Sequence, residues 1–199
     1  MTAPITAELF TSVDLVVSQP QDWHFPWVDD EMLAEISREQ ATSTLLLGHT
    51  TYRAFAAVWP EAGAVPPPAA QLNAMRKVVV SDHIDEADAG WQHTRILRPR
   101  GDLAGAVRRL ADETSDRITI AGSISIVEQL LGLGLLAELR LIVHPLVLGD
   151  GRRLFDGRRP PRIELRHTRT RRFASGARLD VYRPGRIHGN PADVAEPTK

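Results

Sequence analysis

The sequence contains no cysteine among its 199 residues. It can therefore form neither disulfide bonds nor a zinc site with thiolate ligands, and it has no thiol nucleophile. Its apolar runs are far shorter than the roughly 20 residues that a membrane-spanning helix requires, and its N-terminus lacks a basic region followed by an apolar stretch. We expect a protein that does not enter a membrane and that is located in the cytoplasm.

The sequence also lacks an excess of charge of either sign, because 24 Lys and Arg oppose 25 Asp and Glu. No global field attracts nucleic acid, so nucleic acid is not an expected partner and any anion site must be local. The histidines show no spacing typical of metal ligands, so no metal site is expected. The Gly-x-Ser-x-Gly turn of many hydrolases is missing as well.

Hydrophobic residues make up 43% of the chain, which is enough for one domain with its own core. We predict that this domain spans residues 1–184. Residues Gly185–Lys199 are polar and show no apolar period. They are therefore predicted to form a disordered tail.

Two segments have the pattern of a buried strand that enters a helix through small residues. Ile118–Leu131 breaks at Gly122-Ser123, and Thr44–Ala57 breaks at Gly48. If the two strands are parallel neighbours, both helix N-termini lie at the carboxyl edge of the sheet and can clamp a pyrophosphate. Ordinary turn chemistry is the alternative interpretation of each junction, because the Gly-x-Gly-x-x-Gly fingerprint is absent.

Alternation of strand and helix patterns between these junctions predicts a largely parallel sheet, and two alternating C-terminal segments predict antiparallel edge strands. A long first strand, interrupted at Thr11–Asp14, is expected over Ile5–Val17. The proline-rich stretch Trp59–Ala70 is expected to be an ordered loop or a flexible surface segment. Asp29 or Asp30 and Asp102 are candidate helix caps. The remaining expected strands are Lys77–Val80, Thr94–Leu97, Arg162–Thr170 and Ala177–Tyr182.

Six short motifs occur in an order and spacing that resemble the dihydrofolate reductase-like superfamily. Within it they resemble the stand-alone branch related to the C-terminal reductase domain of the bifunctional riboflavin-biosynthesis deaminase/reductase. The resemblance covers about Ile5 to Pro184. The motifs are Leu46–Tyr52, Trp59-Pro60, Lys77–Ser81, Ala121–Ser123, Gly134–Leu139 and Pro145–Phe155.

This resemblance implies an α/β fold with a mixed, mainly parallel sheet of about eight strands flanked by helices, with antiparallel C-terminal strands. It also implies a homodimer with NADPH across the carboxyl ends of the strands. Carried over by position, Gly48 and Thr51 contact the cofactor phosphates from the first junction, and Gly122 and Ser123 contact them from the second. Ser81 lies near the phosphate of the adenosine ribose.

Several positions depart from the family pattern. His49 stands where the family commonly has arginine for the 2′-phosphate, so NADH is not excluded, and Arg98 or Arg100 is a candidate to supply that charge. Asp14 is the only carboxylate that we nominate for catalysis, with a backbone cap as the alternative. Trp27 is predicted to line a substrate pocket for a flat heterocycle, or else to belong to an aromatic loop folded onto the core.

The resemblance does not extend to the pterin-binding carboxylate of dihydrofolate reductases, because Met32 occupies its position. Dihydrofolate reduction is therefore not expected. The sequence predicts an NAD(P)H-dependent reductase of a small heteroaromatic or carbonyl substrate, which resembles 5-amino-6-(5-phosphoribosylamino)uracil reductase of riboflavin biosynthesis. The alternative is a non-catalytic nucleotide or small-ligand binding module on the same fold.

Overall fold

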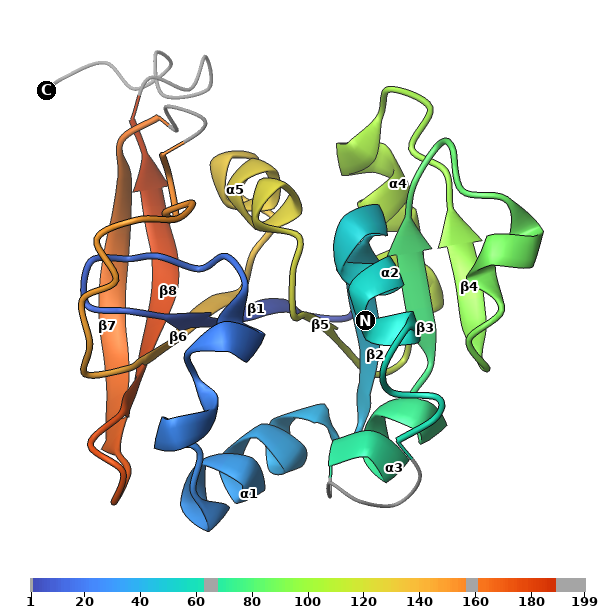
Figure 1. Ribbon diagram of the computed structural model, residues 1–199. Helices are drawn as coiled ribbons and strands as arrows, with labels where there is room; N and C mark the ends of the chain where they lie inside the picture. The colour runs from blue at the N-terminus through green and yellow to red at the C-terminus, as the bar shows by residue number, and fades with distance from the viewer. Residues whose placement is uncertain (1, 63–67, 157–160, 189–199) are drawn as a thin grey trace, which may run out of the picture.

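The structure is a computed structural model, which describes residues 2–62, 68–156 and 161–188. Eight strands form a single sheet in the order β4-β3-β2-β5-β1-β6-β8-β7, with helices on both faces (Figure 1). Neighbouring strands from β4 to β6 are parallel, whereas β8 pairs antiparallel with β6 and with β7. The predicted mixed, mainly parallel sheet with antiparallel C-terminal strands is thus confirmed.

The elements have the following bounds. The strands are β1 (Ile5–Thr11), β2 (Ser43–Gly48), β3 (Lys77–Val80), β4 (Thr94–Leu97), β5 (Arg117–Ile120), β6 (Glu138–Val143), β7 (Ile163–Arg172) and β8 (Arg178–Ile187). The α-helices are α1 (Asp30–Gln40), α2 (His49–Ala56), α3 (Pro68–Ala74), α4 (Leu103–Glu113) and α5 (Ile124–Gly132). Short 3-10 helices are η1 (Pro20–Asp22), η2 (Phe25–Trp27) and η3 (Glu86–Ala89).

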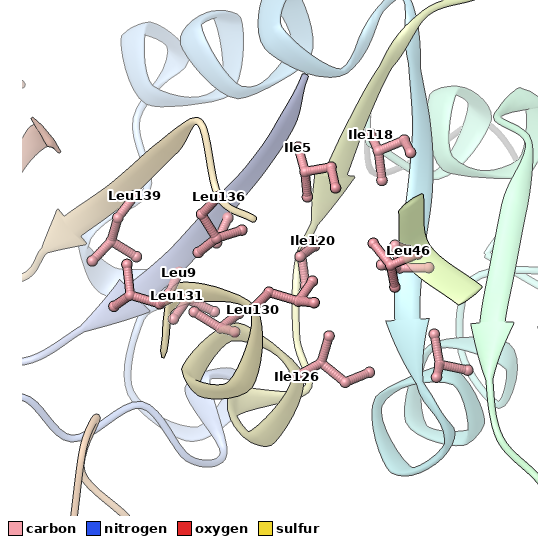
Figure 2. Packing of buried hydrophobic residues seen from close by; sticks show 14 of the residues in the cluster. Ile5, Leu9, Leu46, Ile118, Ile120, Ile126, Leu130, Leu131, Leu136 and Leu139 are labelled. Carbon is pink, nitrogen blue, oxygen red and sulfur yellow. The ribbon is translucent and has the colours of Figure 1, made fainter. Parts of the chain in front are cut away.

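Helices α4 and α5 cover one face of the sheet. Their apolar side chains pack against alternate residues of the central strands in one continuous cluster. Figure 2 shows Ile126 and Leu130 of α5 beside Ile120 of β5, with Leu9 and Leu46 in the same cluster. Because this cluster extends from β3 to β6, burial of its apolar area fixes α5 over the centre of the sheet.

The other face carries α1, α2 and α3 over two separate apolar clusters. One is built around Tyr52 and Leu72, and the other around Met32 of α1. Where the sheet faces α1, it also presents charged side chains. Arg140 of β6 is 3% exposed, and it donates to Glu8 of β1 at 2.9 Å and to Glu35 of α1 at 3.2 Å.

This buried ion network positions α1, because Glu35 also accepts hydrogen bonds from Arg38, Arg169 and Arg171. Burial, the largest influence, would raise the pKa of Glu35, but these guanidinium groups together lower it to about 2. The pKa of Glu8 is raised, because its burial outweighs the attraction of Arg140. Glu35 is therefore firmly ionised, whereas Glu8 is the weaker member of the network.

Three sequence expectations need correction. Strand β1 ends at Thr11 rather than at Val17, because the Ser12 hydroxyl accepts from the Val16 amide and closes a turn. The expected loop over Trp59–Ala70 already becomes helical at Pro68, where proline is tolerated in a first turn. Within it, residues 63–67 lie outside the described residues.

The third correction concerns the predicted tail from Gly185 to Lys199. Strand β8 continues through Gly185 to Ile187, and Ile187 pairs with Ile163 of β7. A backbone ladder needs no apolar period, so composition alone did not reveal this extension. Strand β8 therefore extends past the boundary predicted at residue 184, while residues 189–199 lie outside the described residues.

Candidate functional site

The two strand–helix junctions predicted from the sequence lie side by side. Strands β2 and β5 are parallel neighbours, with Leu46 opposite Ile120, so both end at the same edge of the sheet. Strand β2 enters α2 directly after Gly48, and β5 enters α5 through Ala121, Gly122 and Ser123. The predicted arrangement of the two junctions is confirmed.

The junctions also touch each other, and glycine is needed for this contact. The Gly48 amide donates to the Gly122 carbonyl at 3.3 Å, and a Cβ on Gly48 would lie 2.4 Å from the Ser123 Cβ. Gly122 has φ of 136°, and a Cβ there would lie 3.0 Å from the Thr51 hydroxyl oxygen. The Gly122–Ser123 peptide bond is cis. Four of the predicted cofactor residues therefore form one small-residue surface.

The helix N-termini at this surface differ from those elsewhere in the fold. Helices α1 and α4 are capped by Asp29 and Asp102, whose carboxylates accept from the Met32 and Gly105 amides at 2.8 Å. Within the described residues, no side-chain cap is present at Gly48 before α2 or at Ser123 before α5. The Ser123 hydroxyl, at the start of α5, is instead 2.6 Å from the Ser125 hydroxyl. The first amides of α2 and α5 thus present uncompensated positive partial charge where an anion can approach.

His49 occupies the first position of α2 and borders a surface hollow of about 380 Å³. Arg53, one helical turn further on, lines the same hollow with Thr50 and Ala54. Arg53 lies in the last turn of α2, where its positive charge is favourable for the helix dipole. Together the two side chains provide a basic surface next to the uncapped amides.

Ser81 and Arg98 are both occupied with the turn that follows β3. The Ser81 hydroxyl oxygen accepts from the His83 and Ile84 amides, each at 3.1 Å. The Arg98 guanidinium donates to the Ile84 carbonyl at 2.9 Å and to the Asp82 carbonyl at 3.3 Å. Ser81 lies at the edge beside Gly48, since Gly48 pairs with Val80. In the structure, Arg98 thus stabilises this turn through hydrogen bonds, and its guanidinium is not held ready for a phosphate.

Asp14 lies after β1, at the same edge, but its carboxylate is fully engaged. It accepts hydrogen bonds from the Ser12 hydroxyl at 2.7 Å, from the Leu148 and Gly149 amides at 3.1 and 3.0 Å, and from Arg153 at 3.1 Å. The Ser12 hydrogen bond and these other donors hold its pKa well below the usual range. Such a group does not donate a proton near neutral pH. These contacts match the alternative role of Asp14, in which it caps backbone amides and joins two loops.

Trp27 lies on η2 and is partly buried against the cluster that contains Met32. The structure does not bring it into contact with the paired junctions. The neighbouring Trp23 and His24 contact His144, which follows β6. The spacing of the histidines along the chain does not single out His24 or His144. The position of His144 directly after a buried strand was the available signal.

The described residues contain no group of three or more His, Asp or Glu side chains arranged to hold a metal ion. Among the helices in the described ranges, none is both long and apolar enough to cross a membrane.

This chain is similar to three known proteins, one by sequence and two by structure. The uncharacterized protein YyaP of Bacillus subtilis (strain 168) is 38% identical over 76 residues, which span 38% of this chain and 40% of YyaP. The riboflavin biosynthesis reductase Rib7 of Saccharomyces cerevisiae has 14% identity and a TM-score of 0.61, over 92% of this chain and 90% of Rib7. Dihydrofolate reductase from Enterococcus faecalis, solved as a complex with NADP(H), has 12% identity and a TM-score of 0.61. That match covers 94% of this chain and all of the reductase.

At these identities the two solved structures establish the fold alone, which is that of the dihydrofolate reductases and riboflavin reductases. The YyaP match spans less than half of that protein. A broader match comes from the RibD C-terminal domain, whose sequence pattern covers residues 3–179. The chain therefore belongs to the RibD C-terminal domain family.

Proposed function

We propose that this protein is an NADPH-dependent reductase of a small heteroaromatic or carbonyl compound. The observation that carries the proposal is the pair of uncapped helix N-termini at Gly48 and Ser123, which touch at the carboxyl edge of β2 and β5. Family membership and the NADP(H) complex of the E. faecalis reductase support the use of a nicotinamide cofactor. The cytoplasmic location and the homodimer expected from the sequence belong to this proposal.

The residues present fit a dinucleotide pyrophosphate. Gly48 and Gly122 remove side-chain bulk where the backbones meet, and the amides of α2 and α5 supply donors without a net charge. Thr51 and Ser123 add hydroxyl groups next to them. His49 and Arg53 provide positive charge for a 2′-phosphate, and Ser81 has a hydroxyl hydrogen that its two accepted bonds leave available.

When bound, the cofactor supplies a hydride, while the protein orients it and excludes water. Asp14 does not serve as the proton donor in this proposal, because its carboxylate is saturated with hydrogen bonds. Its role is to fix the Leu148–Arg153 loop beside the end of β1. The proton for the substrate is then taken from water or from the substrate itself.

The engagement of Asp14 is also the observation that favours the alternative function, a module that binds a nucleotide without turnover. Both functions require cofactor binding, so a titration with NADPH and NADH tests what they share. A turnover assay separates the reductase from the binding module. It offers the protein a panel of carbonyl and heteroaromatic substrates and monitors the loss of NADPH absorbance. Binding without any consumption of NADPH would favour the module.

The decisive variant is Ser123→Asp. Aspartate is a good N-cap and should preserve or stabilise α5, but its charge opposes a pyrophosphate at the same amides. Two unit charges about 4 Å apart repel by about 4 kcal/mol at an effective dielectric constant near 20, so NADPH affinity should fall at least about 100-fold. The matched control is Asp102→Ser, which changes the cap of α4 and should leave affinity unchanged. Unaltered affinity in Ser123→Asp would exclude this site.

A further inference from the structure

Five aromatic rings join the segment after β1 to the ends of β1 and β6. His24 stacks on Phe10 of β1 with ring centroids 4.6 Å apart, and it also contacts Phe25 at 4.2 Å. His144 receives the edges of Trp23 at 5.1 Å and Phe10 at 5.5 Å. The two imidazoles themselves are 6.1 Å apart. We call residues 19–28 the aromatic loop, and these rings attach it to the sheet.

The hydrogen bonds of His144 define its tautomer. Its Nδ1 lies 3.0 Å from the Ile142 carbonyl and 3.2 Å from the Thr11 carbonyl. Both partners are acceptors, so Nδ1 carries the hydrogen. The side chain is fully buried, and Nε2 has no hydrogen-bond partner in the described part of the structure. A second proton on this ring would place an unpaired cation among apolar rings.

His24 has a similar constraint, since its Nδ1 is also buried and unpartnered among the described residues. Burial, reinforced by the neighbouring His144, lowers the pKa of His24 to about 4. Burial likewise lowers the pKa of His144, although its two carbonyl partners oppose this. Burial therefore disfavours protonation of each ring, and His144 adds to this effect at His24.

The charged groups on the surrounding elements do not compensate for an imidazolium. Glu8 of β1 and Arg140 of β6 are bonded to each other. Asp29, before α1, accepts from the Met32 and Ser175 amides, and Asp14 is engaged as described above. Asp22 of η1 is exposed. In the described ranges, no carboxylate forms an ion pair with His24 or His144.

We propose that His24 and His144 form a proton-operated latch, which holds the aromatic loop on the sheet while both rings are neutral and releases it when they are protonated. The inference is independent of the proposed cofactor site. A histidine with a lowered pKa in the closed state stabilises that state fully above its ordinary value of about 6.5. This stabilisation is lost as the pH falls from about 6.5 toward 4.

The latch also affects the packing of Trp27, because this residue of the aromatic loop packs against the cluster around Met32. As the pH falls from 6.5 toward 4, His24 raises the ratio of open to closed loop by up to about tenfold per pH unit, and protonation of His144 adds to this dependence. The core beneath α5 contains no histidine, so it should stay closed while the loop opens.

The four tryptophan indole N–H groups provide a direct test by ¹H–¹⁵N NMR. Trp23 and Trp27 lie in the aromatic loop, whereas Trp59 and Trp91 belong to the cluster around Tyr52 and serve as internal controls. Between pH 6.5 and 4 we expect the Trp23 and Trp27 indole signals to move reversibly, and the other two to remain in place. The Trp23 indole now donates to the Ser18 carbonyl at 3.0 Å, so its signal reports the closed loop.

The variant His24→Phe with His144→Asn removes both titrating groups, keeps an aromatic ring at 24 and retains a donor near the carbonyls at 144. It should abolish the transition, whereas the control His83→Asn, at an exposed histidine, should retain it. If the double variant does not fold, His24→Phe alone should remove the contribution of His24, up to about tenfold per pH unit, and should leave a shallower transition. Simultaneous movement of all four indoles, or an unchanged transition in the double variant, would overturn the latch.

Discussion

Replacing Arg140 by methionine tests the buried network that holds α1 on the sheet. Arg140 is 3% exposed and bridges Glu8 and Glu35. Removing one partner of a buried ion pair costs about 3–5 kcal/mol. Glu35 keeps Arg38, Arg169 and Arg171, and Glu39, the third carboxylate near Arg140, keeps Arg117. Among the described residues, Glu8 is thus the one carboxylate that loses its only ion-pair partner. We therefore expect the lower end of that range, a loss of about 3 kcal/mol in the free energy of unfolding at pH 7.

The assay is urea unfolding followed by tryptophan fluorescence, at pH 7 and at pH 5. Burial already raises the pKa of Glu8 in the parent protein, and without Arg140 that pKa rises further. A carboxyl group whose pKa is higher in the folded than in the unfolded state favours folding when it is protonated. Its penalty grows as the pH rises through the folded pKa. The deficit of Arg140→Met should thus be smaller at pH 5 than at pH 7.

Adding Glu8→Gln to Arg140→Met provides the control, because it removes the buried charge and retains a polar group of similar shape. The double variant should recover a large part of the lost stability at pH 7 and should show little dependence on pH. An equal deficit at both pH values, with no recovery by Glu8→Gln, would refute the electrostatic argument. Arg140 would then contribute mainly through packing of its aliphatic stem.

Three further predictions follow from the site and from β8. Asp14→Asn should leave the pH profile of any turnover unchanged, since a carboxylate with a strongly lowered pKa does not donate protons; loss of one limb of the profile would restore Asp14 as the acid. His49→Gln should reduce the preference for NADPH over NADH, measured by calorimetry, and an unchanged preference would assign the 2′-phosphate to Arg53 instead. Truncation after Pro184 should lower the melting temperature by a few degrees, because it deletes the end of β8, whereas truncation after His188 should not; equal melting temperatures would show that residues 185–188 add no stability.

The sequence was most informative where local chemistry and the fold agree. Strand–helix alternation and the two glycine-containing junctions predicted the parallel sheet. Two neighbouring parallel strands must be joined by a long crossover, and that crossover is usually a helix. Asp102 was recognisable as a cap, and Asp29 or Asp30 as another, because such bonds lie within one helical turn; the structure shows that Asp29 is the cap of α1. The end of β8 was missed because its pairing partner, β7, is an antiparallel neighbour whose effect is invisible in composition.

The candidate site divides in the same way. The residue types at Gly48, Gly122, Ser123 and Thr51 were sufficient to predict a small-residue surface, because glycine freedom and helix amides are local properties. Asp14 is separated by more than 130 residues of chain from its partners Leu148, Gly149 and Arg153. Only the tertiary structure therefore shows that its carboxylate is already hydrogen-bonded. The same holds for His24 and His144, whose neutrality depends on burial between two distant segments. The sequence thus determined the backbone donors of the site, whereas solvation and long-range hydrogen bonds decided which ionisable side chains remain free to act.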